Sequence, residues 1–267
     1  ELSLVPDMTV AENIWLTHEP LTGGVLVDSN RVEEETRELL ELCGLEPGMR
    51  VLDVGCGVGH TPKILAGWYE CRVVGIDLLP RMVGRSRGVV SGAGVGDQVG
   101  FAVADAQALP FDDGVFDLVM AESLHVFLDD PARAFAAYAR VVKPGGCVGI
   151  TEAVWLDETS EDRASNYLGM TGADFRPPDV WADHLEAAGL VDVVTRVHAS
   201  DLKAEARGRL KRFGCGGMLG AMWGAIGAIL RDRSIRVKLK DAMGQVPQDV
   251  KDTLGYGVFV GRKMATD

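Results

Sequence analysis

The fold of this chain is decided by the run Val51-Leu52-Asp53-Val54-Gly55-Cys56-Gly57-Val58-Gly59-His60. Its first residues are mostly apolar and predict a buried strand, and three glycines at alternate positions predict a tight turn. A helical pattern follows at 61–68. Glycines at a strand–turn–helix junction let backbone N–H groups approach a ligand without interference from side chains. The run therefore predicts a binding site for a nucleotide-like cofactor.

The glycine spacing and a neighbouring acid indicate which cofactor to expect. The dinucleotide fingerprint is G-x-G-x-x-G, and its turn faces a pyrophosphate. Here the spacing is G-x-G-x-G, His60 occupies the position where that fingerprint needs Gly or Ala, and Asp53 lies two residues before the first glycine. A carboxylate would repel a pyrophosphate but suits S-adenosylmethionine (SAM), which carries a sulfonium and an ammonium and no phosphate. A nicotinamide-dependent oxidoreductase is therefore disfavoured; an ordinary turn with a solvated Asp53 is the simpler alternative.

Composition restricts the classes of protein to consider. The 267 residues, 47% of them hydrophobic, fit one α/β domain with an elaboration or at most two domains. The formal net charge of -12 disfavours a nucleic-acid partner, because neutralising phosphates requires clustered Lys and Arg. The five cysteines lack paired spacing, which favours free thiols in a reducing compartment. No metal-ligand spacing and no secretory leader is evident, so we expect no metal and a cytoplasmic location.

Apolar runs alternate with helical patterns along the first two thirds of the chain. The expected strands are 50–54, 71–77, 99–104, 116–121 and 147–152, and the expected helices are 31–44, 61–68, 81–91 and 131–142. Strands separated by helices imply a parallel sheet with right-handed crossovers. Beyond them we expect a polar loop or short insert at 155–178, a helix at 179–189, a strand at 190–197, mostly helical structure at 204–244 and a final strand at 254–263.

Ligands of an open parallel sheet bind beyond the carboxyl ends of its strands, so the residues there are the candidate site. Asp77 can accept both ribose hydroxyls, and Leu78 and Met82 can contact an adenine face; Asp77 as a helix cap is the alternative. Asp105 can accept from the exocyclic amine of adenine, or it is a turn residue. The expected cofactor-binding residues are Asp53, Gly55, Cys56, Gly57, Asp77, Leu78, Met82, Asp105, Ala106 and Glu122.

Because acids and glycines occupy the ends of these strands together, the chain resembles the class I SAM-dependent methyltransferases, and specifically their type 11 group. The resemblance covers about residues 36–152 and lies in five blocks, 51–59, 73–78, 104–111, 116–119 and 142–146. It implies a Rossmann-like, seven-stranded, mostly parallel sheet with helices on both faces and an antiparallel last strand. It also implies Asp77 on the ribose, Asp105 near the adenine, and the 55–59 turn beneath the methionine moiety.

Four regions are expected: an N-terminal lid (1–30), the SAM-binding core (31–200), a helical cap inserted before the last strand (201–250), and that strand (251–267). Residues 2–14 look instead like a segment of sugar-transporter ATP-binding subunits, but the chain has no G-x-x-x-x-G-K-[ST] loop. The uncharged stretch 213–230 is rich in Gly, Ala and Met. It can cover the sheet, line an apolar pocket or, through flanking basic residues, contact a membrane surface.

Methyl transfer from SAM is a direct displacement, so an enzyme mainly aligns the reactants and excludes water. A base is needed only if the nucleophile must lose a proton. The catalytic candidates are Glu122, His125 and Glu152; the alternatives are a structural His at a helix start and a Glu that only accepts hydrogen bonds. We expect methylation of a small metabolite, with an apolar acceptor as one option and S-adenosylhomocysteine (SAH) as product, by a monomer or homodimer. The other hypothesis is a SAM-binding regulatory or partner protein.

Overall fold

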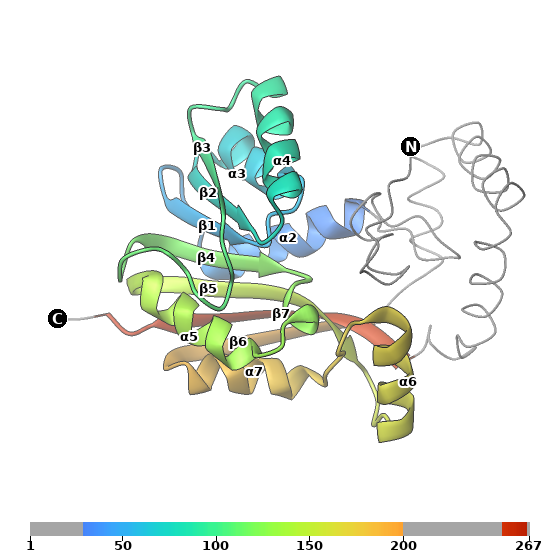
Figure 1. Ribbon diagram of the computed structural model, residues 1–267. Coiled ribbons are helices and arrows are strands. Elements are labelled where there is room, and N and C mark those ends of the chain that lie inside the picture. The colour runs from blue at the N-terminus through green and yellow to red at the C-terminus, as the bar shows by residue number, and fades with distance from the viewer. Residues whose placement is uncertain (1–28, 200–252, 266–267) are drawn as a thin grey trace, which may run out of the picture. The chain divides into compact units, whose positions relative to one another are not determined.

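The computed structural model describes residues 29–199 and 253–265 (Figure 1). The predicted cap lies outside the described residues, and so does all but the last part of the predicted lid. Two compact units are distinguished, and the larger one comprises 35–155, 175–198 and the C-terminal strand. None of the helices in the described ranges has the length and apolarity needed to traverse a lipid bilayer.

The larger unit is built on a seven-stranded sheet of order β3-β2-β1-β4-β5-β7-β6. The strands are β1 (Arg50–Val54), β2 (Arg72–Asp77), β3 (Val99–Val103), β4 (Phe116–Glu122), β5 (Val142–Trp155), β6 (Leu190–Ala199) and β7 (Leu254–Lys263). The first five pair in parallel, and Figure 1 shows β7 running opposite to β4. The predicted seven-stranded, mostly parallel sheet is confirmed.

Helices cover both faces of this sheet. They are α2 (Ser29–Cys43), α3 (His60–Tyr69), α4 (Pro80–Gly92), the short 3-10 helix η1 (His125–Phe127), α5 (Pro131–Val141) and α7 (Pro178–Ala187). Apolar side chains of α2, α3 and α4 share one core cluster with alternate residues of the central strands. Figure 1 shows α5 and α7 in front of the sheet and α2 behind it. Because both faces are covered, the central strands are apolar runs with no exposed side.

Two predictions about local structure need correction. Strand β5 begins at Val142, five residues before the predicted start at Cys147, and a register irregularity lies between Phe116 and Leu118 of β4, which pairs with it. The predicted loop at 155–178 contains the helix α6 (Glu161–Thr171), which belongs to the smaller unit. The Ser160 hydroxyl accepts a hydrogen bond from the Arg163 N–H, and Gly172 ends the helix in the left-handed conformation. These are ordinary start and stop signals that the polar composition obscured.

Gly59 fixes how α3 leaves the glycine turn. It precedes α3 with φ 83°, and a Cβ added there would lie 2.8 Å from Cβ and 3.1 Å from Cα of Ser86 on α4. The third glycine of the run is therefore required by close packing of two helices, and the backbone conformation independently favours glycine.

We predict that Gly59→Ala lowers the free energy of unfolding by about 2 kcal/mol, because the methyl group overpacks the contact with Ser86 at a positive φ. Gly88→Ala is the control, since Gly88 lies within α4 and an added Cβ would meet nothing within 4 Å. This control should keep or slightly raise stability, because Ala is the better helix former. Urea unfolding of both variants makes the comparison, and equal stabilities would contradict the packing argument.

Candidate cofactor and active site

The glycine turn presents open backbone at the carboxyl end of β1. Gly55 and Gly57 have φ values of 76° and 52°, and the Gly55 and Cys56 N–H groups donate to the Ile76 carbonyl at 2.8 and 2.9 Å. A Cβ at Gly57 would meet nothing within 4 Å. The Cys56 side chain is buried, and its pKa is raised mainly by burial and further by Asp53 and Asp77. The turn is therefore fixed by hydrogen bonds to Ile76 of β2, and it leaves free space beside Gly57.

Asp77 ties this turn to the end of β2. Its Oδ2 accepts a hydrogen bond from the Gly57 N–H at 3.1 Å, and its Oδ1 accepts one from the Leu79 N–H at 2.8 Å. Burial raises the pKa of Asp77, although both backbone donors and Arg81 act in the opposite direction. Each carboxylate oxygen has a second lone pair. Asp77 therefore holds the turn that leads into α4 and retains acceptor capacity for a ligand, while Leu79 occupies the cap position of α4 without a side-chain cap hydrogen bond.

Asp53 is a buried acid of the site with an unpaired oxygen. Its side chain is 2% exposed, and its Oδ2 has no hydrogen-bond partner among the described residues. Its pKa is raised well above the usual value by burial first, then by the negative charges of Glu122 and Asp77. A buried, unpaired carboxylate beside two like charges is unfavourable unless a cation or a donor comes to it.

Glu122 at the end of β4 is held at both oxygens by threonine hydroxyls. The Thr36 hydroxyl of α2 donates to Oε1 at 2.5 Å, and the Thr61 hydroxyl of α3 donates to Oε2 at 2.7 Å. Burial raises the pKa of Glu122, and the two hydroxyls act to lower it. Elements from three parts of the sequence thus fix the direction of this carboxylate.

The residues predicted to meet an adenine occupy different environments. Leu78 follows the end of β2 and is 65% exposed. Met82 belongs to α4 and is only 7% exposed. Asp105 accepts from the Gln107 N–H at 2.9 Å through Oδ1, which makes it a turn residue with further acceptor capacity. Ala106 beside it is buried. Leu78 thus leaves apolar surface exposed directly beside Asp77.

His125 and Glu152 lie together, but away from open surface. Each is 1% exposed, and His125 Nδ1 lies 2.8 Å from Glu152 Oε1. The same oxygen accepts the Leu124 and His125 N–H groups at 2.8 and 2.6 Å. Of the three catalytic candidates, Glu122 shares an electrostatic site with Asp53, while His125 and Glu152 form a separate buried pair.

Sequence reasoning missed Thr36, Thr61 and Leu124. Thr61 directly follows the glycine run at the start of α3, so its position was a usable signal. Thr36 lies 86 residues from Glu122 in the sequence, and nothing local to α2 indicates that contact.

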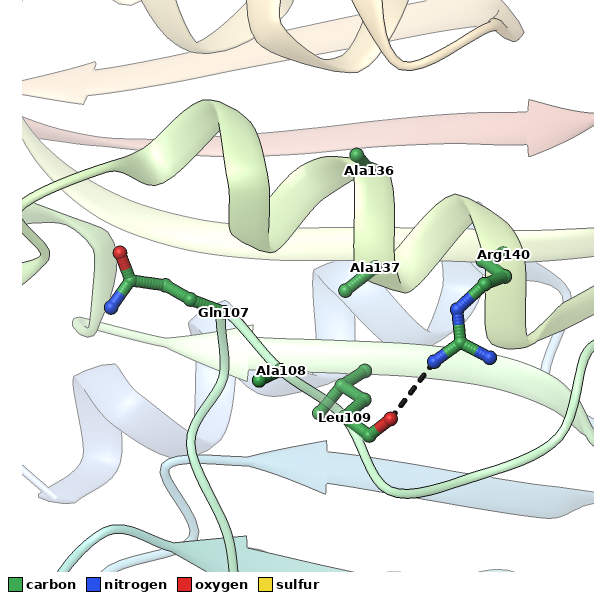
Figure 2. Close-up of a pocket in the computed structure, with 6 residues that line it drawn as sticks. All are labelled: Gln107, Ala108, Leu109, Ala136, Ala137 and Arg140. Atoms are coloured by element: carbon green, nitrogen blue, oxygen red, sulfur yellow. Dashed lines mark hydrogen bonds between the residues drawn. The ribbon is translucent and has the colours of Figure 1, made fainter.

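The cavity in Figure 2 is a different feature from this site. It has a volume of about 400 Å³ and is lined by Gln107, Ala108, Leu109, Ala136, Ala137 and Arg140. The Arg140 guanidinium donates to the carbonyls of Leu109 and Phe111 at 2.8 and 2.6 Å and pairs with Asp113. Its donors are thus used to hold the loop before β4, and none of the predicted cofactor residues lines the cavity. Across the described ranges, no group of three or more His, Cys, Asp and Glu side chains is arranged to hold a metal ion.

Comparison with known proteins decides the family. Residues 52–150 match the family model of a methyltransferase domain, in its type 11 form. O-methyltransferase cnsE of Penicillium expansum is 32% identical over 202 residues, which are 74% of this chain and 72% of that protein. The chain belongs to the class I SAM-dependent methyltransferases. Phosphoethanolamine N-methyltransferase 1 of Arabidopsis thaliana is 31% identical over 179 residues, 67% of this chain, and the chain spans only 36% of that relative's length.

Solved structures share the methyltransferase fold. A SAM-dependent methyltransferase of Geobacter sulfurreducens in complex with SAH has a TM-score of 0.67 at 22% identity, with 97% of this chain and 100% of that one covered. The [4+2]-cyclase SpnF has a TM-score of 0.68 at 23% identity, with 92% and 86% covered. At these identities the likeness establishes the fold and leaves the activity to be argued from the site.

We predict that Asp53→Asn stabilises the ligand-free protein at neutral pH by roughly 1–3 kcal/mol, because it removes a buried carboxyl group whose ionisation is unfavourable in the folded state. The sign follows from linkage: a carboxyl whose folded-state pKa is raised costs stability as the pH rises from its unfolded value, about 3.9, through the raised value. The gain should therefore be absent below about pH 4, where the carboxyl is protonated in both states, and should grow as the pH rises towards the raised folded-state pKa. Thermal unfolding across this range, with the exposed Asp97→Asn as control, measures it. A destabilised Asp53→Asn protein at neutral pH would contradict the assignment.

Proposed function

We propose that this chain binds SAM at the carboxyl ends of β1 to β4 and catalyses transfer of its methyl group to a small-molecule acceptor. One observation carries the proposal. The unpaired, buried Asp53 carboxylate lies in the electrostatic field of Asp77 and Glu122, beside a turn whose Gly57 backbone borders open space. This concentration of negative charge suits a ligand with a sulfonium and an ammonium, and it opposes a phosphate.

The residues present fit the parts of SAM. Asp77 has acceptor capacity left for the ribose hydroxyls, and the exposed Leu78 offers an apolar surface for the adenine. Asp105 can accept from the adenine amine, and Asp53 and Glu122 would face the cationic end. In this assignment Cys56 contributes its backbone to the SAM site. Met82, as a buried residue of α4, contributes packing of that helix.

When bound, SAM supplies a methyl group already activated for displacement by its sulfonium. The chain's own residues then need to orient the two reactants, balance charge and exclude water. The two threonine hydroxyls keep Glu122 pointing in one direction, which favours charge complementarity over proton transfer as its role. A base is required only for acceptors that lose a proton.

The names of the relatives leave the acceptor atom open. They include a phosphoethanolamine N-methyltransferase, a sterol 24-C-methyltransferase and an O-methyltransferase. The net charge of -12 supports a small metabolite over a nucleic acid as the acceptor. We further propose a cytoplasmic monomer or homodimer in which 1–30 and 201–250 act as lid and cap. The four described cysteines carry free thiols, which agrees with a reducing compartment.

A SAM-binding protein without methyl transfer is the second candidate. The fold likeness to a protein named as a [4+2]-cyclase favours keeping it, because one fold can support different reactions. Both candidate functions require SAM binding at the same site. They differ in whether the methyl group is transferred to an acceptor.

Calorimetric titration with SAM, SAH and NADH tests the cofactor. We expect micromolar binding of the two sulfur ligands and none of NADH. Incubation with methyl-labelled SAM and a panel of amines, phenols, sterols and phosphoethanolamine then tests transfer. Binding without transfer to any acceptor would favour the second candidate, and absence of SAM binding would refute both.

Asp77→Ala should weaken SAM binding by roughly 1–3 kcal/mol, the usual cost of stranding hydrogen-bonding groups. Part of this loss is indirect, because Gly57 N–H and Leu79 N–H also lose their acceptor. Asp77→Asn retains one acceptor oxygen and should lose less. Wild-type affinity in both variants would remove Asp77 from the site.

A further inference from the structure

One oxygen of Glu152 contacts three nitrogen atoms of Leu124 and His125, in the loop that follows β4. Oε1 accepts the backbone N–H groups of Leu124 and His125 at 2.8 and 2.6 Å, and it lies 2.8 Å from His125 Nδ1. Glu152 belongs to β5, and the loop follows β4. Hydrogen bonds to a buried carboxylate are among the stronger ones in proteins. The loop is thus attached to the neighbouring strand by a charged side chain as well as by the sheet.

The loop requires such an attachment because its backbone is strained. Ser123 has φ 51°, in the left-handed region that non-glycine residues rarely adopt, and its N–H donates to the Thr151 carbonyl at 2.8 Å. This conformation costs free energy, and surrounding contacts must hold it. After Ser123 the chain turns so that two consecutive N–H groups point at Glu152.

The next residue brings the loop to the cofactor turn. A Cβ built on Gly55 would lie 3.2 Å from both Cδ1 and Cδ2 of Leu124, so the leucine side chain packs directly against the Gly55 backbone. Gly55 is the first glycine of the turn and is itself in the left-handed region. Any movement of the Leu124 backbone is therefore transmitted to the turn.

We propose that Glu152 is a positioning residue for the cofactor site: by fixing the Leu124 and His125 N–H groups, it keeps Leu124 packed on Gly55 and so preserves the shape of the turn that receives SAM. The proposal rests on the proposed function, because the turn is the SAM site there. It assigns Glu152 a role through Leu124, without contact with the reacting atoms.

The surroundings of His125 support positioning over proton transfer. Its ring stacks on Phe135 at a centroid distance of 4.7 Å, meets Tyr138 edge-on at 5.6 Å and lies 6.0 Å from Trp181. One ring nitrogen contacts Glu152, and the other has no hydrogen-bond partner among the described residues. A base must reach the proton that it removes, and aromatic rings enclose this imidazole on three sides. His125 therefore supplies a donor and ring packing to the same attachment.

A double-mutant cycle on SAM and SAH affinity tests this chain of contacts. We expect Glu152→Ala and Leu124→Ala each to raise the Kd for both ligands about tenfold. The double variant should bind little worse than either single one, because Glu152 acts through Leu124 and coupled residues are not additive. Glu152→Gln keeps one acceptor oxygen and should recover part of the affinity. His125→Phe keeps the ring packing and both backbone bonds but removes the side-chain contact with Glu152, so it should raise the Kd less than Glu152→Ala does.

Controls separate this proposal from the proposed function. Wild-type binding of SAM and SAH must be present first, and its absence would refute the proposed function alone. The exposed Glu186→Ala should bind like wild type. Thermal unfolding checks that each variant is folded, and if Glu152→Ala is not, Glu152→Gln replaces it in the cycle with Leu124→Ala. Wild-type affinity in a folded Glu152 variant, or additive losses in the double variant, would overturn the proposal.

Discussion

Burial of the Asp53 carboxylate beside Asp77 and Glu122 is the constraint on which the site depends. Three like charges at one sheet edge repel each other, and desolvation opposes each charge separately. Asp77 and Glu122 are compensated by donors from the chain itself, Gly57 and Leu79 for the former and two threonines for the latter. Asp53 keeps an oxygen without a partner in the described chain. The fold therefore holds three clustered carboxyl groups, one of them with an unpaired oxygen, at the sheet edge proposed to receive a cationic cofactor.

The rest of the architecture maintains that arrangement. Helix α2 packs on the sheet so closely that a Cβ on Gly149 of β5 would lie 2.9 Å from Cys43 Sγ, and this packing brings Thr36 to Glu122. Gly59 allows α3 to pack on α4, which brings Thr61 to the other oxygen of the same carboxylate. The stability lost by burying Asp53 is thus offset by packing elsewhere, a distribution common at functional sites.

The sequence predicts those elements and site residues that are marked by nearby residues in the chain. The bounds of β1 and β7 agree with the predicted ranges, because each is an apolar run with clear ends. Helix α6 was missed although Ser160 and Gly172 mark its ends, since its polar composition resembled a loop. Asp53, Gly57 and Asp77 could be found as strand-end residues of a parallel sheet. Their partners could not, because Thr36–Glu122 and Leu124–Gly55 are tertiary contacts that no periodicity encodes.

Proton release on SAM binding is the most direct test of the central electrostatic claim. If Asp53 has a raised pKa in the free protein, a cation bound beside it must lower that pKa, so binding must expel protons at pH values between the two. Calorimetry at a series of pH values above about 4, in buffers of different ionisation enthalpy, counts the protons released. The account predicts net release in the wild-type protein that Asp53→Asn reduces, because Asp77 and Glu122 also have raised pKa values. SAM binding with no proton release, or with release unchanged in Asp53→Asn, would contradict it.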